Sequence, residues 1–249
     1  MDQRAGNRRF VPIAGRRLSV WHAGEGCPAV VMEAGAGDSG DVWEAVFAGL
    51  AAFTRVYRYD RAGLGESDPA TQPRTLEDMA EDLERLLRVA QVSAPYVLVG
   101  HSFGGPIVHL YAQRHPENVA GLVLVDPAHP DSLAYAADVF PGLLANLENI
   151  DLETSIGEMR SLGSVGAIPV TVLVAGNRVY PPELPPSVLA SLYQLWDDRL
   201  RQLSTLSTRG RHILVPDSDH YIHVNRPDVV VDAVRRVVED VQMHGCPQM

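Results

Sequence analysis

The sequence predicts an α/β fold, in which helices cover both faces of a mostly parallel, twisted sheet of eight strands. Short apolar, β-branched runs alternate along the chain with amphipathic stretches of helical period. This alternation is typical of parallel strands joined by crossover helices. Several runs are apolar throughout, which indicates strands that are buried on both faces. At 249 residues the chain is long enough for one large domain with a substantial core.

The predicted strands begin with a hairpin at one edge of the sheet. Residues 9–13 and 18–22 are expected to pair antiparallel around a turn at Ala14-Gly15. Six later runs are expected to form the parallel strands: residues 29–32, 56–59, 96–99, 121–125, 170–175 and 212–215.

Helices are predicted between these strands. The clearest covers residues 76–89, where Thr75 as N-cap and Asp78 three residues later resemble a capping box. The other helices are expected over residues 103–114, 187–206 and 228–241.

Residues 127–167 interrupt the alternation. The segment carries only scattered apolar positions, and a structureless loop of this length is rare inside a compact domain. We therefore expect a small helical lid, or cap, inserted into a core formed by residues 1–126 and 168–249.

Composition and charge restrict the function and the location. The formal net charge of −10 makes nucleic acid and anionic membranes poor partners. No apolar segment follows the polar, Arg-rich residues 1–10, and no run reaches the length of a membrane span. We therefore expect a cytoplasmic protein with no signal peptide. A disulfide between Cys27 and Cys246 is possible, but two free thiols are the prediction.

Lysine and the spacing patterns of common cofactor and metal sites are missing from the sequence. All 21 basic residues are arginine, so a Schiff-base lysine and a P-loop are excluded. No histidines or cysteines stand at metal-ligand spacing, and no dinucleotide-binding fingerprint follows a first strand. The sequence therefore predicts chemistry without a cofactor or a metal.

A candidate nucleophile stands between a predicted strand and a predicted helix. Ser102 lies in the pattern Gly-x-Ser-x-Gly at residues 100–104. A serine on a sharp strand-to-helix turn needs small neighbours two residues away on both sides, because its backbone is strained and both chain arms crowd it. The alternative, a glycine-rich turn without chemistry, does not require a strand before it and a helix after it.

From about residue 11 to residue 241 the chain resembles the α/β-hydrolase superfamily. The residues that carry this resemblance occur in the expected order: VVMEAGAG at 30–37 followed by Trp43, YDRAGLGESD at 59–68, the serine turn, VLVDP at 123–127, and SDH at 218–220 followed by Pro227. The resemblance implies the fold predicted above and a serine hydrolase with a catalytic triad.

His220 is the predicted general base. It follows the last predicted strand, at the sheet end where ligands bind in α/β folds, and an imidazole is suited to take the serine proton. His223 is three residues away, where the superfamily often has a second, non-catalytic residue. His101 cannot easily reach around to the serine hydroxyl, and His129 is placed to line the pocket.

The triad acid departs from the common pattern of the superfamily. Most members carry it after the strand corresponding to residues 170–175, but here no carboxylate appears before Glu183. Some members carry it at the end of the preceding strand, where this chain has Asp126, although an aspartate before proline also recurs there as a turn former. Asp126 is the prediction; Glu183, a Ser-His diad and another carboxylate such as Asp131 stay open.

The resemblance also assigns an oxyanion hole and a pocket. The two donors are expected to be the backbone amides of Phe103 and Ala36, and Gly35, His101, His129 and Tyr221 are candidate pocket residues. Glu33 is interpreted as structural, and Asp60 as a turn-fixing carboxylate paired with Arg61.

Together these features predict a cofactor-independent serine hydrolase that cleaves a small or medium-sized apolar ester, lactone or thioester through an acyl-serine intermediate. Two alternatives remain: a lyase, cyclase or cofactor-free oxidative enzyme that uses the Ser-His pair for acid–base chemistry, and a ligand-binding protein without catalysis. The sequence leaves the substrate, the pathway and the oligomeric state open.

Overall fold

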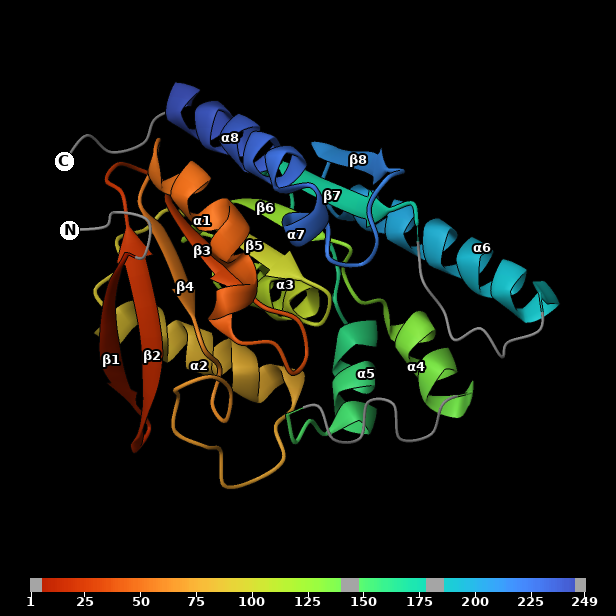
Figure 1. Ribbon diagram of the computed structural model, residues 1–249, viewed down its shortest axis with the longest axis horizontal. Helices are drawn as coiled ribbons and strands as arrows, with labels where there is room; N and C mark the ends of the chain where they lie inside the picture. The colour runs from red at the N-terminus through yellow and green to blue at the C-terminus, as the bar shows by residue number, and fades with distance from the viewer. Residues whose placement is uncertain (1–5, 140–147, 178–185, 245–249) are drawn as a thin grey trace.

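A computed structural model describes residues 6–139, 148–177 and 186–244. Its eight strands form one sheet in the order β1-β2-β4-β3-β5-β6-β7-β8 (Figure 1). The strands are β1 (Asn7–Ile13), β2 (Arg16–Ala23), β3 (Ala29–Glu33), β4 (Val56–Tyr59), β5 (Tyr96–His101), β6 (Val119–Val125), β7 (Val170–Ala175) and β8 (Gly210–Val215). The first two pairings, β1 with β2 and β2 with β4, are antiparallel, and all later ones are parallel. The predicted α/β sheet with its edge hairpin is therefore confirmed.

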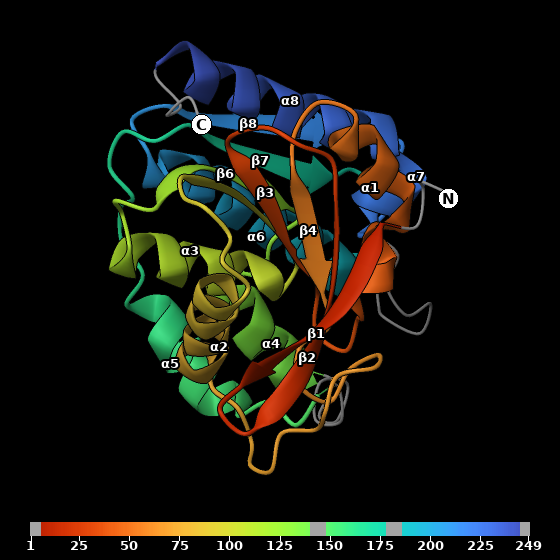
Figure 2. The ribbon, with the colours of Figure 1, turned by 90° about the vertical axis from the view of Figure 1, so that its left-hand side faces the viewer.

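Helices cover both faces of this sheet. Within the described residues they are α1 (Glu44–Ala51), α2 (Leu76–Val89), α3 (Gly104–Arg114), α4 (Pro130–Val139), α5 (Leu152–Arg160), α6 (Pro186–Leu203), α7 (Ile222–Asn225) and α8 (Pro227–Met243). Figure 2 shows α8 and α1 on one side and α2 and α3 on the other. Two separate apolar cores result: Phe47 and Val234 belong to the first, and Leu83 and Ile107 belong to the second.

Most predicted elements match the structure to within a few residues. Helix α2 has the predicted bounds, and the capping box between Thr75 and Asp78 is present with both hydrogen bonds. The turn of the hairpin uses a left-handed backbone at Ala14 and Gly15, with φ of 45° and 81°. Helices α1 and α7 were not predicted.

The segment 127–167 contains α4 and α5, which lie together beside the sheet domain in Figure 1. It is therefore helical in its described part, while its action as a lid stays a prediction. Phe140, Leu143, Leu144 and Leu147, which belong to its apolar pattern, lie outside the described residues.

The cysteine prediction is wrong for Cys27, because this residue is disulfide-bonded. Disulfides are rare in reducing compartments. Cysteine usage therefore no longer supports the expected cytoplasmic location.

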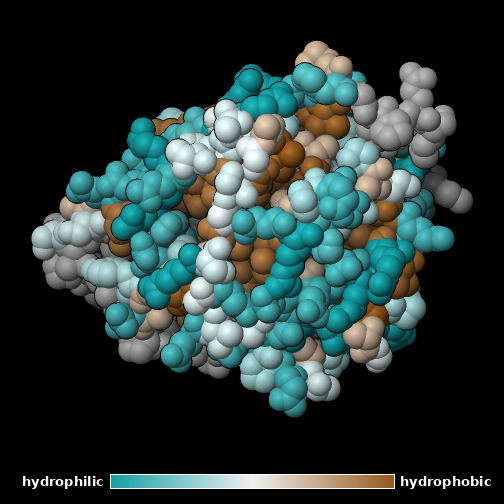
Figure 3. Space-filling view, turned by 180° about the vertical axis from the view of Figure 1, so that it is seen from behind, coloured by the Kyte–Doolittle hydropathy of each residue, from teal (hydrophilic) through white to brown (hydrophobic). Residues whose placement is uncertain are grey.

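No helix among the described residues is long and apolar enough to cross a membrane. On the face shown in Figure 3, hydrophobic side chains reach the surface in patches separated by hydrophilic ones. This face therefore presents no continuous apolar band.

Candidate active site

Ser102 occupies a strained turn between β5 and α3. Its φ of 50° lies in the left-handed region, which residues other than glycine rarely adopt. The turn is held from three sides: the Ser102 amide donates to the carbonyl of Val125 at 3.1 Å, and the Ser102 carbonyl accepts from the amides of Gly105 and Ala128 at 3.0 and 2.9 Å.

The two glycines of the motif are needed because the backbone passes too close for a side chain. A Cβ at Gly104 would lie 2.5 Å from the carbonyl oxygens of Glu33 and Ala34, and one at Gly100 would lie 2.6 Å from the Gly104 carbonyl. Helix α3 can therefore start directly against the end of β3, which brings Ser102 beside the loop that follows β3.

Asp126 and His220 form a hydrogen-bonded pair at the carboxyl ends of the parallel strands, where Ser102 also lies. Asp126 directly follows β6, is fully buried and has a left-handed φ of 40°. Its Oδ2 lies 2.7 Å from Nδ1 of His220, and its Oδ1 accepts from the Ala175 amide at 3.0 Å. The second bond comes from the end of β7, the strand after which most superfamily members carry the acid.

This pairing sets the tautomer of His220. A carboxylate can only accept, so Nδ1 of His220 carries the proton and donates it to Asp126. In the neutral ring Nε2 is then bare and able to take a proton. Within the described residues the Ser102 hydroxyl makes no hydrogen bond. The structure therefore brings together the predicted acid, Asp126, and the predicted base, His220, but records no bond between His220 and Ser102.

His101, next to Ser102, supports the His220 loop from beneath. Its ring is fully buried and donates from Nε2 to the backbone carbonyl of His220 at 3.0 Å. The ring centroids of His101 and His220 are 4.6 Å apart. Burial lowers the pKa of His101 well below its usual value, and His220 and His223 lower it further. His101 is therefore neutral near pH 7.

His223 packs against both His101 and Trp43, with ring centroids 4.4 Å from each. Neither of its ring nitrogens has a hydrogen-bond partner among the described residues. Burial, with a further contribution from His220, lowers the pKa of His223 to about 3. It is a neutral packing residue, in agreement with its predicted non-catalytic place.

The predicted oxyanion donors come from two segments that meet at Gly104. Phe103 directly follows the serine, and Ala36 lies in the loop after β3, whose end packs against Gly104. Within the described chain neither the Ala36 amide nor the Phe103 amide donates to a protein acceptor. Gly35 precedes Ala36 and faces His101, because a Cβ on Gly35 would lie 2.8 Å from Nδ1 of His101.

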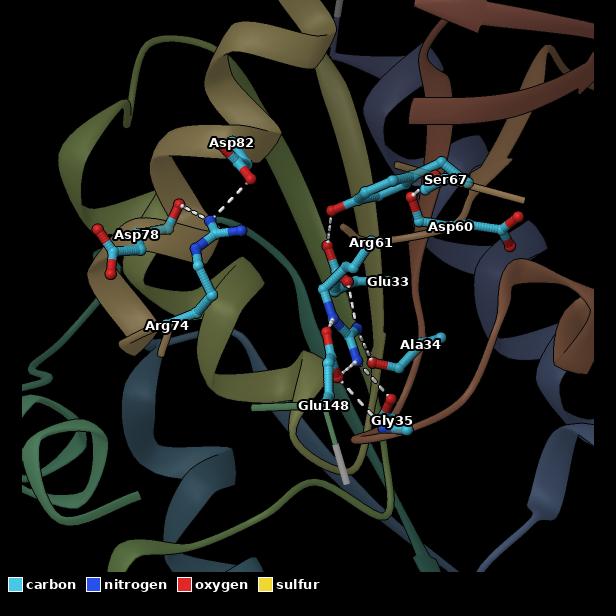
Figure 4. A network of polar contacts seen from close by, with 12 residues as sticks. Glu33, Ala34, Gly35, Asp60, Arg61, Ser67, Arg74, Asp78, Asp82 and Glu148 are labelled. Atoms are coloured by element: carbon cyan, nitrogen blue, oxygen red, sulfur yellow. Dashed lines mark hydrogen bonds and ion pairs between the residues drawn. The ribbon is translucent and has the colours of Figure 1, made fainter. Parts of the chain in front are cut away.

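The predicted pairing of Asp60 with Arg61 is wrong. Asp60 does fix the turn, since it accepts from the amides of Gly40 and Glu66 at 2.8 and 3.0 Å. Arg61 instead binds Glu33 and Glu148 (Figure 4). Burial raises the pKa of Glu33, although Arg61 and Tyr59 lower it. The structural interpretation of Glu33 agrees with this buried pair.

A cavity of about 370 Å³ lies next to Pro127, the residue after Asp126, and is lined by residues of α4, α5 and α6. It is lined by Gly105, Pro127, Ala128 and the predicted pocket residue His129, among others, but neither Ser102 nor His220 reaches it. Tyr221 follows His220 in the sequence, and its hydroxyl is 3.5 Å from Oδ1 of Asp38.

Glu183 and Asp131 are the alternative acids that the sequence left open. Glu183, the alternative acid, lies outside the described residues. Asp131 is 3.1 Å from Nε of Arg199 in the cavity wall. Across the described ranges, no three histidine, cysteine or acidic side chains cluster in a way that could hold a metal ion.

The strand order and the serine turn define the class of protein. The family model of the alpha/beta hydrolase fold matches residues 28–163, more than half of the chain, and the chain belongs to this family.

Among individual relatives, the chain is similar to the uncharacterized protein YqjL of Bacillus subtilis, with 29% identity over 88% of this chain and 85% of that protein. Two solved structures share the fold. A thermophilic esterase from Thermogutta terrifontis has a TM-score of 0.68 at 19% identity, covering 95% of this chain and 99% of that one. The enol-lactonase from Burkholderia xenovorans has a TM-score of 0.68 at 18% identity, covering 93% and 100%.

Proposed function

We propose that this protein is a serine hydrolase that cleaves a small carboxylic ester, lactone or thioester through an acyl-serine intermediate, without a cofactor. The observation that carries the proposal is the 2.7 Å bond between buried Asp126 and Nδ1 of His220, next to a serine held at a strained strand-to-helix turn. An ordinary glycine-rich turn needs neither the strain nor the pair.

The proposed reaction proceeds in two halves. Nε2 of His220 takes the Ser102 proton while Oγ attacks the substrate carbonyl carbon, and the amides of Ala36 and Phe103 stabilise the oxyanion. The tetrahedral intermediate then expels the alcohol or thiol, which takes the proton from His220. In the second half His220 takes a proton from water, which attacks the acyl-serine. The acid is then released, and His220 returns the proton to Oγ of Ser102.

A fluorophosphonate probe tests the nucleophile. We expect stoichiometric labelling of Ser102 in the wild-type protein and none in Ser102→Ala or His220→Ala. A folded wild-type protein that takes up no probe would contradict the proposal. It would favour a ligand-binding protein.

The acid is tested with a pair of variants on p-nitrophenyl esters. Asp126→Asn should lower kcat by about 10³-fold or more, because the amide no longer fixes the tautomer of His220 or stabilises its charged form. Glu183→Gln serves as the matched control and should keep nearly full turnover. The reverse result would assign the acid to Glu183.

The second candidate, acid–base chemistry without an acyl intermediate, needs only the Ser102–His220 pair. It is favoured if Ser102 takes up the probe but no substrate acyl group is ever found on it. We also propose that the partner is a small molecule and that neither nucleic acid nor a membrane binds at this site, since the net charge is −10.

A further inference from the structure

The Arg61 side chain uses every N–H group of its guanidinium in a buried network. Nε and Nη2 bind the two oxygens of Glu148 at 2.5 and 2.6 Å, and Nη1 binds Oε1 of Glu33 at 2.6 Å. The two remaining bonds go to the carbonyls of Ala34 and Gly35 at 2.6 and 2.5 Å. All three side chains are at most 5% exposed. Figure 4 shows the guanidinium between the two carboxylates and the loop after β3.

These bonds fix the direction of the amides in the loop. In a trans peptide the C=O and N–H groups point in opposite directions. Because Arg61 holds the carbonyl of Gly35, the N–H of Ala36 in the same peptide must point away from Arg61. The neighbouring amide, that of Gly37, is held by Oε2 of Glu148 at 3.2 Å. The Ala36 amide is thus left without a protein acceptor in the described chain, while the groups around it are bound.

Glu148 connects this loop to the insertion after β6. It lies 87 residues from Arg61 in the sequence, shortly before α5. The next residue, Asn149, accepts from the Arg74 amide at 2.9 Å, and Asp151 donates to the Arg74 carbonyl at 2.9 Å. Glu148 and Asn149 have φ of 135° and 53°, values that require support from their surroundings. The insertion is therefore anchored where its carboxylate enters the network.

We propose that Arg61 and Glu148 are positioning residues, which together aim the Ala36 amide at the oxyanion of the reaction. The inference rests on the proposed function, since it needs an oxyanion at Ser102. It adds a residue of the insertion to the requirements for catalysis, although neither side chain touches the substrate. A planar guanidinium is required, because only its fork can bind two carboxylates and two carbonyls at once.

The rate of Ser102 labelling by a fluorophosphonate tests this inference, because phosphonylation also develops charge on an oxygen in the oxyanion hole. Glu148→Gln keeps the shape of the side chain but loses one of its two acceptor oxygens. We expect the second-order labelling rate and kcat for a p-nitrophenyl ester to fall about tenfold, less than the loss of a whole oxyanion donor. KM should change less than twofold. Arg61→Lys, which keeps the charge but not the fork, should lower both rates further.

Thr54→Val is the matched control. It removes a buried hydrogen bond of 2.6 Å to the Pro28 carbonyl, at the opposite end of β3 from the loop. We expect a lower Tm with wild-type labelling and kcat. Wild-type labelling rates in both Glu148→Gln and Arg61→Lys would overturn the inference while leaving the proposed function intact. A wild-type protein that is never labelled would instead overturn the proposed function.

Discussion

At the scale of single residues, the histidines around Ser102 do different work because their partners differ. The Nδ1 of His220 is bonded to a carboxylate, whereas His101 donates to the carbonyl of His220, with its own Nδ1 3.8 Å from Asp38, and His223 packs against Trp43. A carbonyl bond fixes the place of the His220 loop without adding charge. His101 is therefore expected to affect the geometry of the base and not its protonation.

His101→Phe keeps a buried ring but removes the donor to the His220 carbonyl. We expect kcat to fall about tenfold with little change in KM, and stability to fall by about 1–2 kcal/mol, because a buried acceptor loses its partner. His101→Gln, whose amide can donate to the same carbonyl, should recover part of kcat. If Phe and Gln gave equal kcat, the hydrogen bond would have no role in placing His220.

The residue scale also shows where sequence reasoning stops. Ser102, Asp126 and His220 could be predicted from local motifs, because each stands directly or a few residues after the end of a predicted strand. Glu148 carries no such signal, since its partner Arg61 is 87 residues away and the contact depends on how the insertion folds back. For the same reason Asp60, the neighbour of Arg61 in sequence, was wrongly chosen as its partner.

At the scale of elements, the contact between α3 and the end of β3 decides whether the serine turn forms. The N-terminus of α3 can approach β3 only because Gly104 has no side chain. This close packing brings the serine turn and the loop after β3 together, so a change at Gly104 is expected to act on both.

Gly104→Ala should abolish most activity, because its Cβ would lie 2.5 Å from the carbonyl oxygens of Glu33 and Ala34, where β3 ends and the next loop begins. We expect a loss of at least about a hundredfold in kcat, comparable with the loss of an oxyanion donor. Gly157→Ala in α5 is the control, since a Cβ there meets no atom within 4 Å and should leave kcat unchanged. Nearly full activity of Gly104→Ala would contradict the close packing described above.

Helices were predicted well where their ends carry a chemical signal. Helix α2 has its capping box, and its bounds were predicted correctly. Helix α1 has eight residues, and its N-cap, Trp43, makes no side-chain capping bond. Its formation depends on burying Val46, Phe47 and Leu50 against the sheet, a tertiary contact that short-range patterns do not report.

At the scale of the whole molecule, three buried histidines of the described chain, His101, His109 and His223, link stability to pH. Burial lowers the pKa of His223 from 6.5 to about 3, lowers that of His101 well below 6.5, and also lowers that of His109. Below pH 6.5 the unfolded chain therefore binds protons that the folded protein does not. Above pH 6.5 these histidines are neutral in both states and cost no stability. As the pH falls from 6.5 toward the folded pKa of each group, that group lowers the free energy of unfolding by up to about 1.4 kcal/mol per pH unit.

We expect the free energy of unfolding, measured in denaturant, to fall between pH 6.5 and pH 4.5. His223→Phe removes one of these groups and keeps a ring against Trp43, so its slope in this range should be shallower by up to about 1.4 kcal/mol per pH unit. At pH 8 the variant should differ much less from the wild type. Parallel curves for the two proteins would show that His223 titrates normally in the folded state.

The central claim is that Ser102 carries the acyl group during turnover. The most direct measurement is an acid quench during the pre-steady-state reaction with a p-nitrophenyl ester, followed by mass spectrometry of the peptide that contains Ser102. We predict that the mass of the acyl group appears on Ser102 with the kinetics of the first equivalent of p-nitrophenol, and that Ser102→Ala shows neither. Turnover of the ester by Ser102→Ala at the wild-type rate, or an acyl group on another residue, would contradict the account.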